Sequence, residues 1–367
     1  MNNIQFYYDE FEKQVYEIEQ YITSIELQKS MIRELSEKEN SLEGEFNNTL
    51  MYGKIIKDVI TSPIQYNAVI ISIYGSFEKY IDSIFNCYCY NLCDVIDEYK
   101  NLPKLLRDKQ IKKLGDFLTN PQRYRNYNLD VPSAIENTYF SFSNPKEGII
   151  KNISFLVNHG GNLKIDQIAD LAKEFGIENF IHKITNNELF KSYFIEQREH
   201  SEETYKSTLA KDVKVFFDDL DRLVEARNDV AHGWVEVRTD LNTIKERWLA
   251  YLKILAVVIN EAMQTSFAEF LYHSGKLQEL GKPINVIDNH IVCINNGQVL
   301  LGAEDYVIAI NGKGKLKIIK IQTIEIDGKR VDRLTKTNID VGIGLTIRND
   351  LKVNPSYTFY YFNMKEL

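Results

Sequence analysis

Residues 213–233 read VKVFFDDLDRLVEARNDVAHG, a stretch whose apolar residues recur at helical spacing. Residues that are three and four apart lie on one face of a helix. The apolar face consists of Phe216, Leu220, Leu223 and Val230. Gly233 follows as a natural C-cap, because glycine adopts the left-handed conformation that ends many helices. The stretch therefore predicts a helix that packs into a bundle along one face and ends at Gly233.

Two charged or titratable residues lie near the end of this helix. Arg227 continues the apolar face, where a guanidinium needs polar partners, and Glu78 or Asp82 of another apolar segment are candidates. His232 follows five residues later. A helical step of about 100° per residue leaves the two side chains about 140° apart. Both can reach one external point only with help from the last helical turn or from a neighbouring subunit.

An arginine and a histidine without a metal cluster suit the cleavage of RNA. A histidine acts as general base or acid near neutral pH, and a guanidinium stabilises the charge that develops on the phosphorane oxygens. The 2′-hydroxyl of RNA is then the nucleophile, and the products are a 2′,3′-cyclic phosphate and a 5′-hydroxyl. The alternative is structural: the arginine pairs with a carboxylate, and the helix dipole favours a histidine at the C-terminus. Spacing alone leaves both interpretations open.

Helical patterns extend over most of the chain before residue 284. Residues 4–45 carry a narrow apolar stripe among many charges, which suits an antiparallel helix pair or a dimer seam rather than full burial. Residues 65–98 are apolar on nearly all sides, as expected for the central helix of a bundle. The other predicted helices are short ones within 101–145, one at Lys164–Phe175, and a long one that begins at Thr239 or Asp240 and ends near Gly275.

From residue 284 onward, short β-branched runs alternate with Asn-Gly and Asp-Gly pairs, which favour tight hairpin turns. The predicted strands are Val286–Asp288, His290–Ile294, Val299–Leu301, Tyr306–Ile310, Leu316–Ile326, Val341–Ile347 and Tyr357–Phe362. Six or seven strands in about 80 residues suggest a small barrel. The predicted fold is mainly α: a helical domain over 1–283, with an N-terminal helical extension and a mid-chain insertion, is followed by an all-β barrel over 284–367.

The composition is that of a folded protein with an acidic charge balance. The chain has 367 residues, of which 44% are apolar, with few prolines and glycines to indicate disorder. Residues 284–367 hold 11 basic and 9 acidic residues, a balance of +2, whereas the rest holds 33 basic and 43 acidic residues, a balance of −10. A chain with this charge does not attract nucleic acid as a whole, so any such contact is local.

The sequence also bears on compartment and cofactors. Met1–Lys13 is polar and acidic, which argues against a signal peptide. The longest uncharged run, 59–77, contains too many polar residues to cross a bilayer at low cost. The cysteines match no common zinc or iron–sulfur spacing; they are Cys87, Cys89, Cys93 and Cys293. We therefore expect a cytoplasmic protein with free thiols, no metal, no cofactor and no membrane partner.

Three segments resemble a known superfamily. The run Arg227-Asn228-x-x-x-His232-Gly233, at the end of one bundle helix and followed by another, resembles the signature of the HEPN superfamily. Bacterial members of this superfamily include RNase toxins and anti-phage effectors. The run Tyr74-Gly75-Ser76-Phe77-Glu78 resembles the first core helix of the subgroup found beside restriction and toxin–antitoxin loci, and residues 162–177 are similar to the same subgroup. The resemblance covers about residues 60–270.

This resemblance implies roles for named residues. Arg227 and His232 would be catalytic, Asn228 would be the usual polar residue after the arginine, and Glu78 would orient Arg227. It also implies a homodimer in which two such motifs face one cleft. We therefore expect a metal-independent endoribonuclease of a bacterial defence or toxin system, which cleaves RNA such as tRNA and is held off by an antitoxin or another defence-system protein. The alternative is a non-catalytic helical scaffold subunit of a defence complex, since some members have lost activity.

The C-terminal region resembles the second, barrel domain of translational GTPases through the runs 324–331 and 339–345. The chain has no phosphate-binding GTPase loop, so the resemblance does not imply GTP hydrolysis. Its basic residues are candidates for contact with an RNA backbone. They are Lys313, Lys315, Lys317, Lys320, Lys329, Arg330, Arg333 and Lys336. Alternatively, they solubilise the strands and protect the sheet edges.

Overall fold

The computed structural model describes residues 4–39, 62–159, 161–233, 238–295, 300–326, 328–334, 342–346 and 353–362. The chain divides into two compact units, each built from separate pieces of the sequence. The helical unit comprises Gln5–Asn86 and Ser154–Asn260, and the mixed unit comprises Met1–Ile4, Cys87–Ile153 and Glu261–Leu367. The domain boundary between residues 283 and 284 stays a prediction.

The helical unit is formed mainly by the following elements. They are α1 (Ile4–Glu39), α3 (Pro63–Val95), α7 (Ile153–Val157), α8 (Ile165–Glu174), α9 (Phe180–Thr185), α10 (Glu188–Gln197), α11 (Glu202–Lys211), the 3-10 turn η3 (Val213–Phe217), α12 (Asp218–His232), α13 (Leu241–Thr243), the π-helical segment η4 (Ile244–Leu249) and α14 (Ala250–His273). The helices predicted at 65–98, 164–175 and after residue 239 are thus present.

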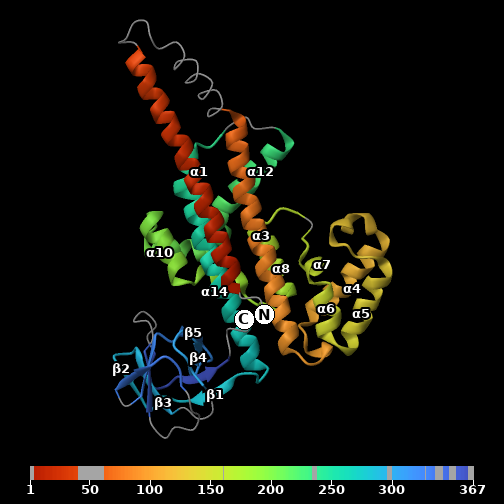
Figure 1. The fold of residues 1–367 in the computed structure, drawn as a ribbon, viewed down its shortest axis with the longest axis vertical. Helices are drawn as coiled ribbons and strands as arrows, with labels where there is room; N and C mark the ends of the chain where they lie inside the picture. The colour runs from red at the N-terminus through yellow and green to blue at the C-terminus, as the bar shows by residue number, and fades with distance from the viewer. Residues whose placement is uncertain are drawn as a thin grey trace. The chain divides into compact units, whose positions relative to one another are not determined.

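The long helices α1 and α3 lie side by side and run in opposite directions (Figure 1). Phe11 near the start of α1 stacks on Tyr80 in the second half of α3, with ring centroids 4.9 Å apart. Further along α1, the Tyr21 hydroxyl donates a hydrogen bond to Gln65 near the start of α3. This confirms the predicted antiparallel pairing of the first helix. Residues 40–45, the end of that predicted helix, lie outside the described residues.

The apolar stripe of α1 is buried and its other faces are exposed, as a narrow stripe predicts. The buried members are Ile4, Phe11, Val15, Ile18, Ile22 and Ile25. The helix α3 is buried over most of its circumference, as expected for the centre of a bundle. Its Tyr80 hydroxyl donates to the Ala256 carbonyl oxygen of α14 at 2.8 Å, which joins the two most apolar helices of the unit.

The helix that carries Arg227 begins later than the sequence predicts. The Asp212 side chain accepts a hydrogen bond from the Lys214 backbone N–H, and residues 213–217 form the 3-10 turn η3. The α-helix starts only at Asp218, where several aspartates in the first turn interact favourably with the helix dipole. Its end agrees with the prediction, because Gly233 has a φ of 73° and caps α12.

The next helix runs from Leu241 to His273 and includes a π-helical segment that the sequence did not predict. Asp240 rather than Thr239 is its N-cap, since the Asp240 side chain accepts from the backbone N–H groups of Asn242 and Thr243. By length and composition this stretch is the one helix of the described chain that could cross a membrane. However, 61% of its most apolar window is buried inside the fold, as is typical of a core helix.

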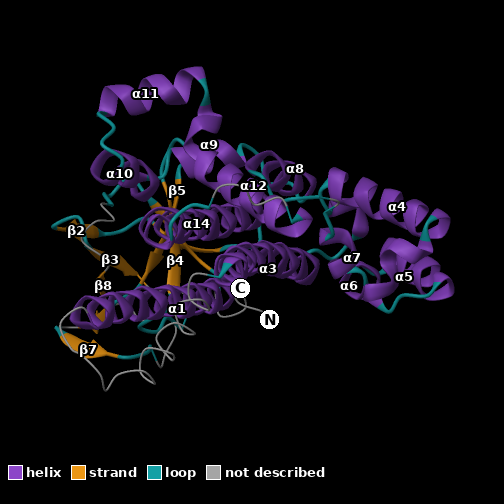
Figure 2. Ribbon diagram, turned by 90° about the horizontal axis from the view of Figure 1, so that it is seen from above, coloured by secondary structure: helices purple, strands orange, loops and turns teal. Residues whose placement is uncertain are grey.

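The mixed unit contains short helices and all the described strands, which are orange in Figure 2. Its helices are η1 (Tyr99–Asn101), α4 (Lys104–Thr119), η2 (Pro121–Tyr127), α5 (Val131–Ser143) and α6 (Pro145–Lys151). Its strands are β1 (Gln278–Gly281), β2 (Asn285–Ile287), β3 (Ile291–Asn295), β4 (Tyr306–Ile310), β5 (Leu316–Lys320), β6 (Thr323–Ile326), β7 (Lys329–Val331), β8 (Gly342–Thr346) and β9 (Thr358–Tyr361). The mainly α fold with a C-terminal β region is confirmed.

The described strands form two antiparallel sheets, and these do not close into the single barrel that the sequence suggested. One sheet has the order β1-β9-β4-β5 and the other the order β2-β3-β8-β6-β7. The predicted strand at 316–326 is two strands, which separate at Ile321 and enter different sheets. Leu300 and Leu301 lie outside the strands, and β1 starts before residue 284. The resemblance to the barrel domain of translational GTPases stays a prediction.

Candidate functional site

The site is built around Arg227, which lies half-buried on α12 and faces two asparagines. Its Nη1 atom donates to Asn162 Oδ1 at 3.3 Å and to Asn228 Oδ1 at 3.2 Å. The Asn162 Nδ2 atom donates to the same Asn228 oxygen at 3.0 Å. The three side chains therefore form a closed hydrogen-bonded triangle, which fixes one edge of the guanidinium.

An aromatic ring supports the guanidinium from another side. The Arg227 Cζ atom lies 5.2 Å from the centroid of the Tyr74 ring on α3, within the range of a cation–π contact. The Tyr74 hydroxyl accepts a hydrogen bond from the Leu163 backbone N–H at 3.0 Å. Because Leu163 follows Asn162 directly, this bond holds the asparagine next to α3. Burial raises the pKa of Tyr74, against the lowering effect of the Leu163 N–H.

Glu78 is linked to this arrangement through Tyr74. The Tyr74 hydroxyl donates to Glu78 Oε1 at 3.3 Å, one helical turn further along α3. Among the described residues, the hydrogen bonds of the Arg227 guanidinium go to the two asparagines. The proposed orientation of Arg227 by Glu78 thus has a route through the tyrosine, and it stays a prediction.

His159 lies beside the same acidic face of α3. Its Nε2 atom is 3.4 Å from Asp82 Oδ1 and 3.9 Å from Glu78 Oε1, and its Nδ1 atom is 2.7 Å from the Gly161 carbonyl oxygen. Two ring nitrogens that both face oxygens favour the doubly protonated imidazolium. Asp82, through hydrogen bonding and charge, raises the pKa of His159 despite the opposing effect of burial.

His232 is the last residue of α12 and is exposed. The backbone remains α-helical from Arg227 to His232, so the separation of about 140° expected from their spacing applies. Arg227 points into the asparagine triangle, whereas His232 lies at the solvated end of the helix. Within the described part of one chain, the structure therefore brings Asn228 to Arg227 but gives no contact between Arg227 and His232.

The predicted RNA-binding cations fall into two groups on different sheets. Lys313 and Lys315 lie in the exposed turn between β4 and β5, and the Lys317 Nζ atom lies 5.7 Å from the Tyr357 ring centroid. The other group consists of Lys329 and Arg330 on β7, with Arg333 shortly after it. Several have acidic partners: Arg330 with Glu325, Arg333 with Asp305 and Lys320 with Glu304. Lys336 lies outside the described residues.

The described residues contain no group of three or more histidine, cysteine or acidic side chains placed to hold a metal ion. Cys87, Cys89 and Cys93 are buried and not disulfide-bonded. Burial raises the pKa of the Cys87 thiol to about 12. The neutral thiol, a poor metal ligand and a poor nucleophile, is then the form present at neutral pH.

Sequence reasoning missed two features of this site. It noted Tyr74 and Asn162 only within longer runs of resemblance and did not place either against Arg227. It gave His159 no role, because the histidines other than His232 show no metal-ligand spacing. In both cases the partners come from segments distant in sequence, with no local periodicity to reveal them.

A protein-family model matches the part of the chain that contains this site. The family described as RiboL-PSP-HEPN matches residues 33–265. The chain belongs to the RiboL-PSP-HEPN family. The match includes the asparagine triangle, Tyr74 and His232, and it ends before the first strand. The predicted HEPN resemblance is thereby confirmed at the level of the superfamily, and it ties this RiboL-PSP-HEPN protein to RNA-related function. No curated protein matches the sequence.

Proposed function

We propose that this RiboL-PSP-HEPN protein is a metal-independent endoribonuclease whose reacting groups are Arg227 and His232. One observation carries the proposal. Of the guanidinium nitrogens of Arg227, only Nη1 bonds to the described residues. The asparagines and Tyr74 thus hold the group in place while Nε and Nη2 remain available for a phosphate. A guanidinium oriented in advance is the arrangement that stabilises a developing oxyanion.

In the proposed reaction, a base removes the proton of the RNA 2′-hydroxyl, and the O2′ atom attacks the adjacent phosphorus. The O2′–P bond forms and the P–O5′ bond breaks, which leaves a 2′,3′-cyclic phosphate. His232 serves as the base or as the acid that protonates the departing O5′ atom. The Arg227 Nε and Nη2 groups donate to the phosphorane oxygens, on which negative charge increases in the transition state.

Because Arg227 and His232 diverge on one helix, we propose that the active form is a homodimer. In it, the arginine of one copy meets the histidine of the other across a shared cleft. The basic residues of β5 and β7 would add RNA backbone contacts. We further propose a cytoplasmic role in bacterial defence or as a toxin, with tRNA as one candidate substrate and an antitoxin or defence-system protein as a partner.

A non-catalytic scaffold is the second candidate function, and one observation favours it. The contacts of Arg227 with Asn162, Asn228 and Tyr74 all lie inside the fold, as those of a structural arginine would. Under this reading, the replacement of Arg227 lowers stability or assembly but affects no reaction.

The test is incubation of the purified chain with total RNA and tRNA in excess EDTA. The Arg227→Ala/His232→Ala double variant is the comparison, and circular dichroism verifies that it is folded. We expect cleavage by the wild type alone, with cyclic phosphate ends. Equal cleavage by both proteins would exclude the two residues as the reacting groups. Cleavage by neither protein, with reduced assembly of the variant, would favour the scaffold.

A further inference from the structure

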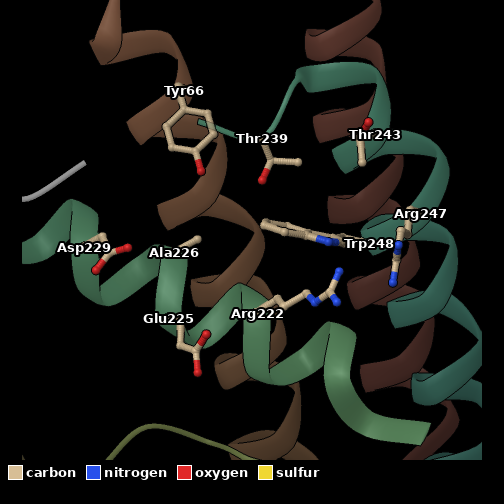
Figure 3. Close-up of a pocket in the computed structure, with 9 residues that line it drawn as sticks. All are labelled: Tyr66, Arg222, Glu225, Ala226, Asp229, Thr239, Thr243, Arg247 and Trp248. Carbon is tan, nitrogen blue, oxygen red and sulfur yellow. The ribbon is translucent and has the colours of Figure 1, made fainter. Parts of the chain in front are cut away.

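A polar cavity of about 250 Å³ lies against one face of α12 (Figure 3). Residues of α12 at helical spacing line one side of it: Arg222, Glu225, Ala226 and Asp229. Across the cavity lie Tyr66 of α3, Thr239, and Trp248 of the π-helical segment η4. The spacing puts these α12 residues on the face opposite to the apolar one that includes Arg227. The cavity is therefore separate from the asparagine triangle.

The π-helical segment carries two of the lining residues, Arg247 and Trp248, and a third, Thr243, directly precedes it. Thr243, Arg247 and Trp248 are four and five residues apart, a spacing that an ordinary α-helix spreads over a wider arc. A π-turn is widened by one residue and brings such positions toward one face. Such π-turns are rare, and they are found frequently at functional sites.

One end of the cavity is lined by the hydrogen-bond donors of Arg222, Arg247 and Trp248. Trp248 is only 5% exposed, and no described residue accepts a hydrogen bond from its indole N–H. Arg222 lies at the rim and forms no ion pair with a described residue. Arg247 uses its Nε atom to bind Asp219 at 2.8 Å, while its terminal nitrogens face the same space. Two guanidinium groups and an indole N–H thus line this end of the cavity, an arrangement that suits an anion such as a phosphate.

The other end presents an acceptor. Asp229 forms no ion pair with a described residue. Glu225, which is closer to Arg222 along α12, does have a partner, since its Oε1 atom lies 3.7 Å from Lys164 Nζ. Asp229 is seven residues after Arg222, or about 10 Å along the helix axis. A carboxylate at this position suits an exocyclic amine, as in the recognition of cytosine N4 by aspartate or glutamate.

We infer that this cavity binds one nucleoside monophosphate unit, with the phosphate at Arg222 and Arg247 and an amino-bearing base at Asp229. The rings of Tyr66 and Trp248, both largely buried, form the aromatic part of the lining. At about 250 Å³, the cavity lies just below the roughly 300–1,000 Å³ of typical ligand pockets, so it has room for one nucleotide at most. The bound group is either one nucleotide of an RNA strand or a free nucleotide. Only the first of these possibilities rests on the proposed function.

Calorimetric titration of the full chain with CMP and UMP tests this site. The two ligands have the same shape, but CMP carries an amine where UMP carries a carbonyl oxygen. We expect CMP to bind at least about tenfold tighter, because the Asp229 carboxylate accepts from the amine and repels the carbonyl. Asp229→Asn should remove this preference for CMP. Arg222→Gln should lower the affinity for both ligands about tenfold. Arg33→Gln and Asp108→Asn, at exposed positions on other helices, should leave binding unchanged.

A second arm uses cytidine and uridine oligonucleotides with 2′-fluorine in place of the 2′-hydroxyl, which cannot be cleaved by 2′-oxygen attack. Preferential binding of the cytidine oligonucleotide alone assigns the site to RNA, and binding of CMP alone assigns it to free nucleotides. The inference is overturned if neither cytidine ligand binds, if inorganic phosphate binds as well as CMP, or if Arg222→Gln changes nothing. Neither binding experiment requires RNA cleavage, so the outcome of each is independent of RNase activity.

Discussion

Asn162 and Asn228, 66 positions apart in the chain, are joined by a hydrogen bond of 3.0 Å between Nδ2 and Oδ1. The same Asn228 oxygen accepts from Arg227, so the position of the guanidinium depends on a residue from outside its own helix. Asn162 in turn is held by the neighbouring Leu163 N–H, which donates to Tyr74. The orientation of Arg227 is thus set jointly by α12, by α3 and by the segment before α8.

Asn162→Ala should therefore weaken RNA cleavage more than it weakens the fold. The change removes hydrogen bonds to Arg227 and Asn228, which we expect to lower the free energy of unfolding by about 1–2 kcal/mol. Cleavage should fall about tenfold or more, because the guanidinium loses its fixed orientation. Urea unfolding and RNA cleavage measure the two effects, with the exposed Asn242→Ala as control. Unchanged cleavage by folded Asn162→Ala would mean that the triangle has no positioning role.

Tyr74→Phe should destabilise the protein even though the aromatic ring is retained. The hydroxyl is the acceptor for the N–H of Leu163, a fully buried residue, and its loss leaves that group unsatisfied. We expect a cost of about 1–3 kcal/mol in the free energy of unfolding. Denaturant titration beside the exposed Tyr139→Phe measures it. Equal stability of the two variants would show that the Leu163 N–H finds another acceptor.

Local periodicity predicted the elements that this site uses but not their contacts. The spacing of Phe216, Leu220 and Leu223 predicted the helix of Arg227, and Gly233 predicted its end, because both signals are local in the chain. The partners of Arg227 are set by tertiary packing. The prediction placed a carboxylate on the guanidinium, whereas the fold supplies two amides and an aromatic ring.

The β region shows the same limit. The alternation of apolar residues predicted strands at 306–310 and around 316–326, yet it could not show that the second run divides between two sheets. Periodicity describes one strand at a time, whereas a sheet is defined by pairing between strands. The pairing of β1 with β9, which joins residues 278–281 to 359–361, leaves no local trace at all.

The interaction of His159 with Asp82 should make stability depend on pH. The folded-state pKa of His159 is raised above its ordinary value of 6.5, so the protonated form is stabilised by folding. This contribution is fully present below about pH 6.5 and is lost as the pH rises through the folded-state pKa. His159→Gln should therefore be destabilising at about pH 5.5 and much less so at about pH 8.5. Thermal unfolding at both values checks this, with His273→Gln as control, and a gap that widens at high pH would contradict it.

Gly148→Ala and Gly115→Ala should change stability in opposite directions. A Cβ atom at Gly148 on α6 would lie 2.0 Å from Ser141 Oγ and 2.3 Å from backbone atoms of α5. The helices would have to separate, which we expect to cost about 1–3 kcal/mol or more. At Gly115 on α4, nothing lies within 4 Å, so alanine should stabilise the helix by up to about 1 kcal/mol. Melting temperatures decide this, and equal shifts would show that α5 and α6 are not so closely packed.

The divergence of Arg227 and His232 on α12 leads to a complementation test of the proposed dimer. If each reaction centre combines the arginine of one copy with the histidine of the other, a heterodimer of Arg227→Ala and His232→Ala chains retains one intact centre of its two. Random assembly makes half of the dimers heterodimers, so co-expressed variants should recover about a quarter of wild-type cleavage. Each variant alone should be inactive. If each centre instead lies within one chain, no mixture contains an intact centre, and the co-expressed variants should be as inactive as the separate ones. Purification through two different affinity tags isolates the heterodimer, whose activity per dimer should then be about half that of the wild type.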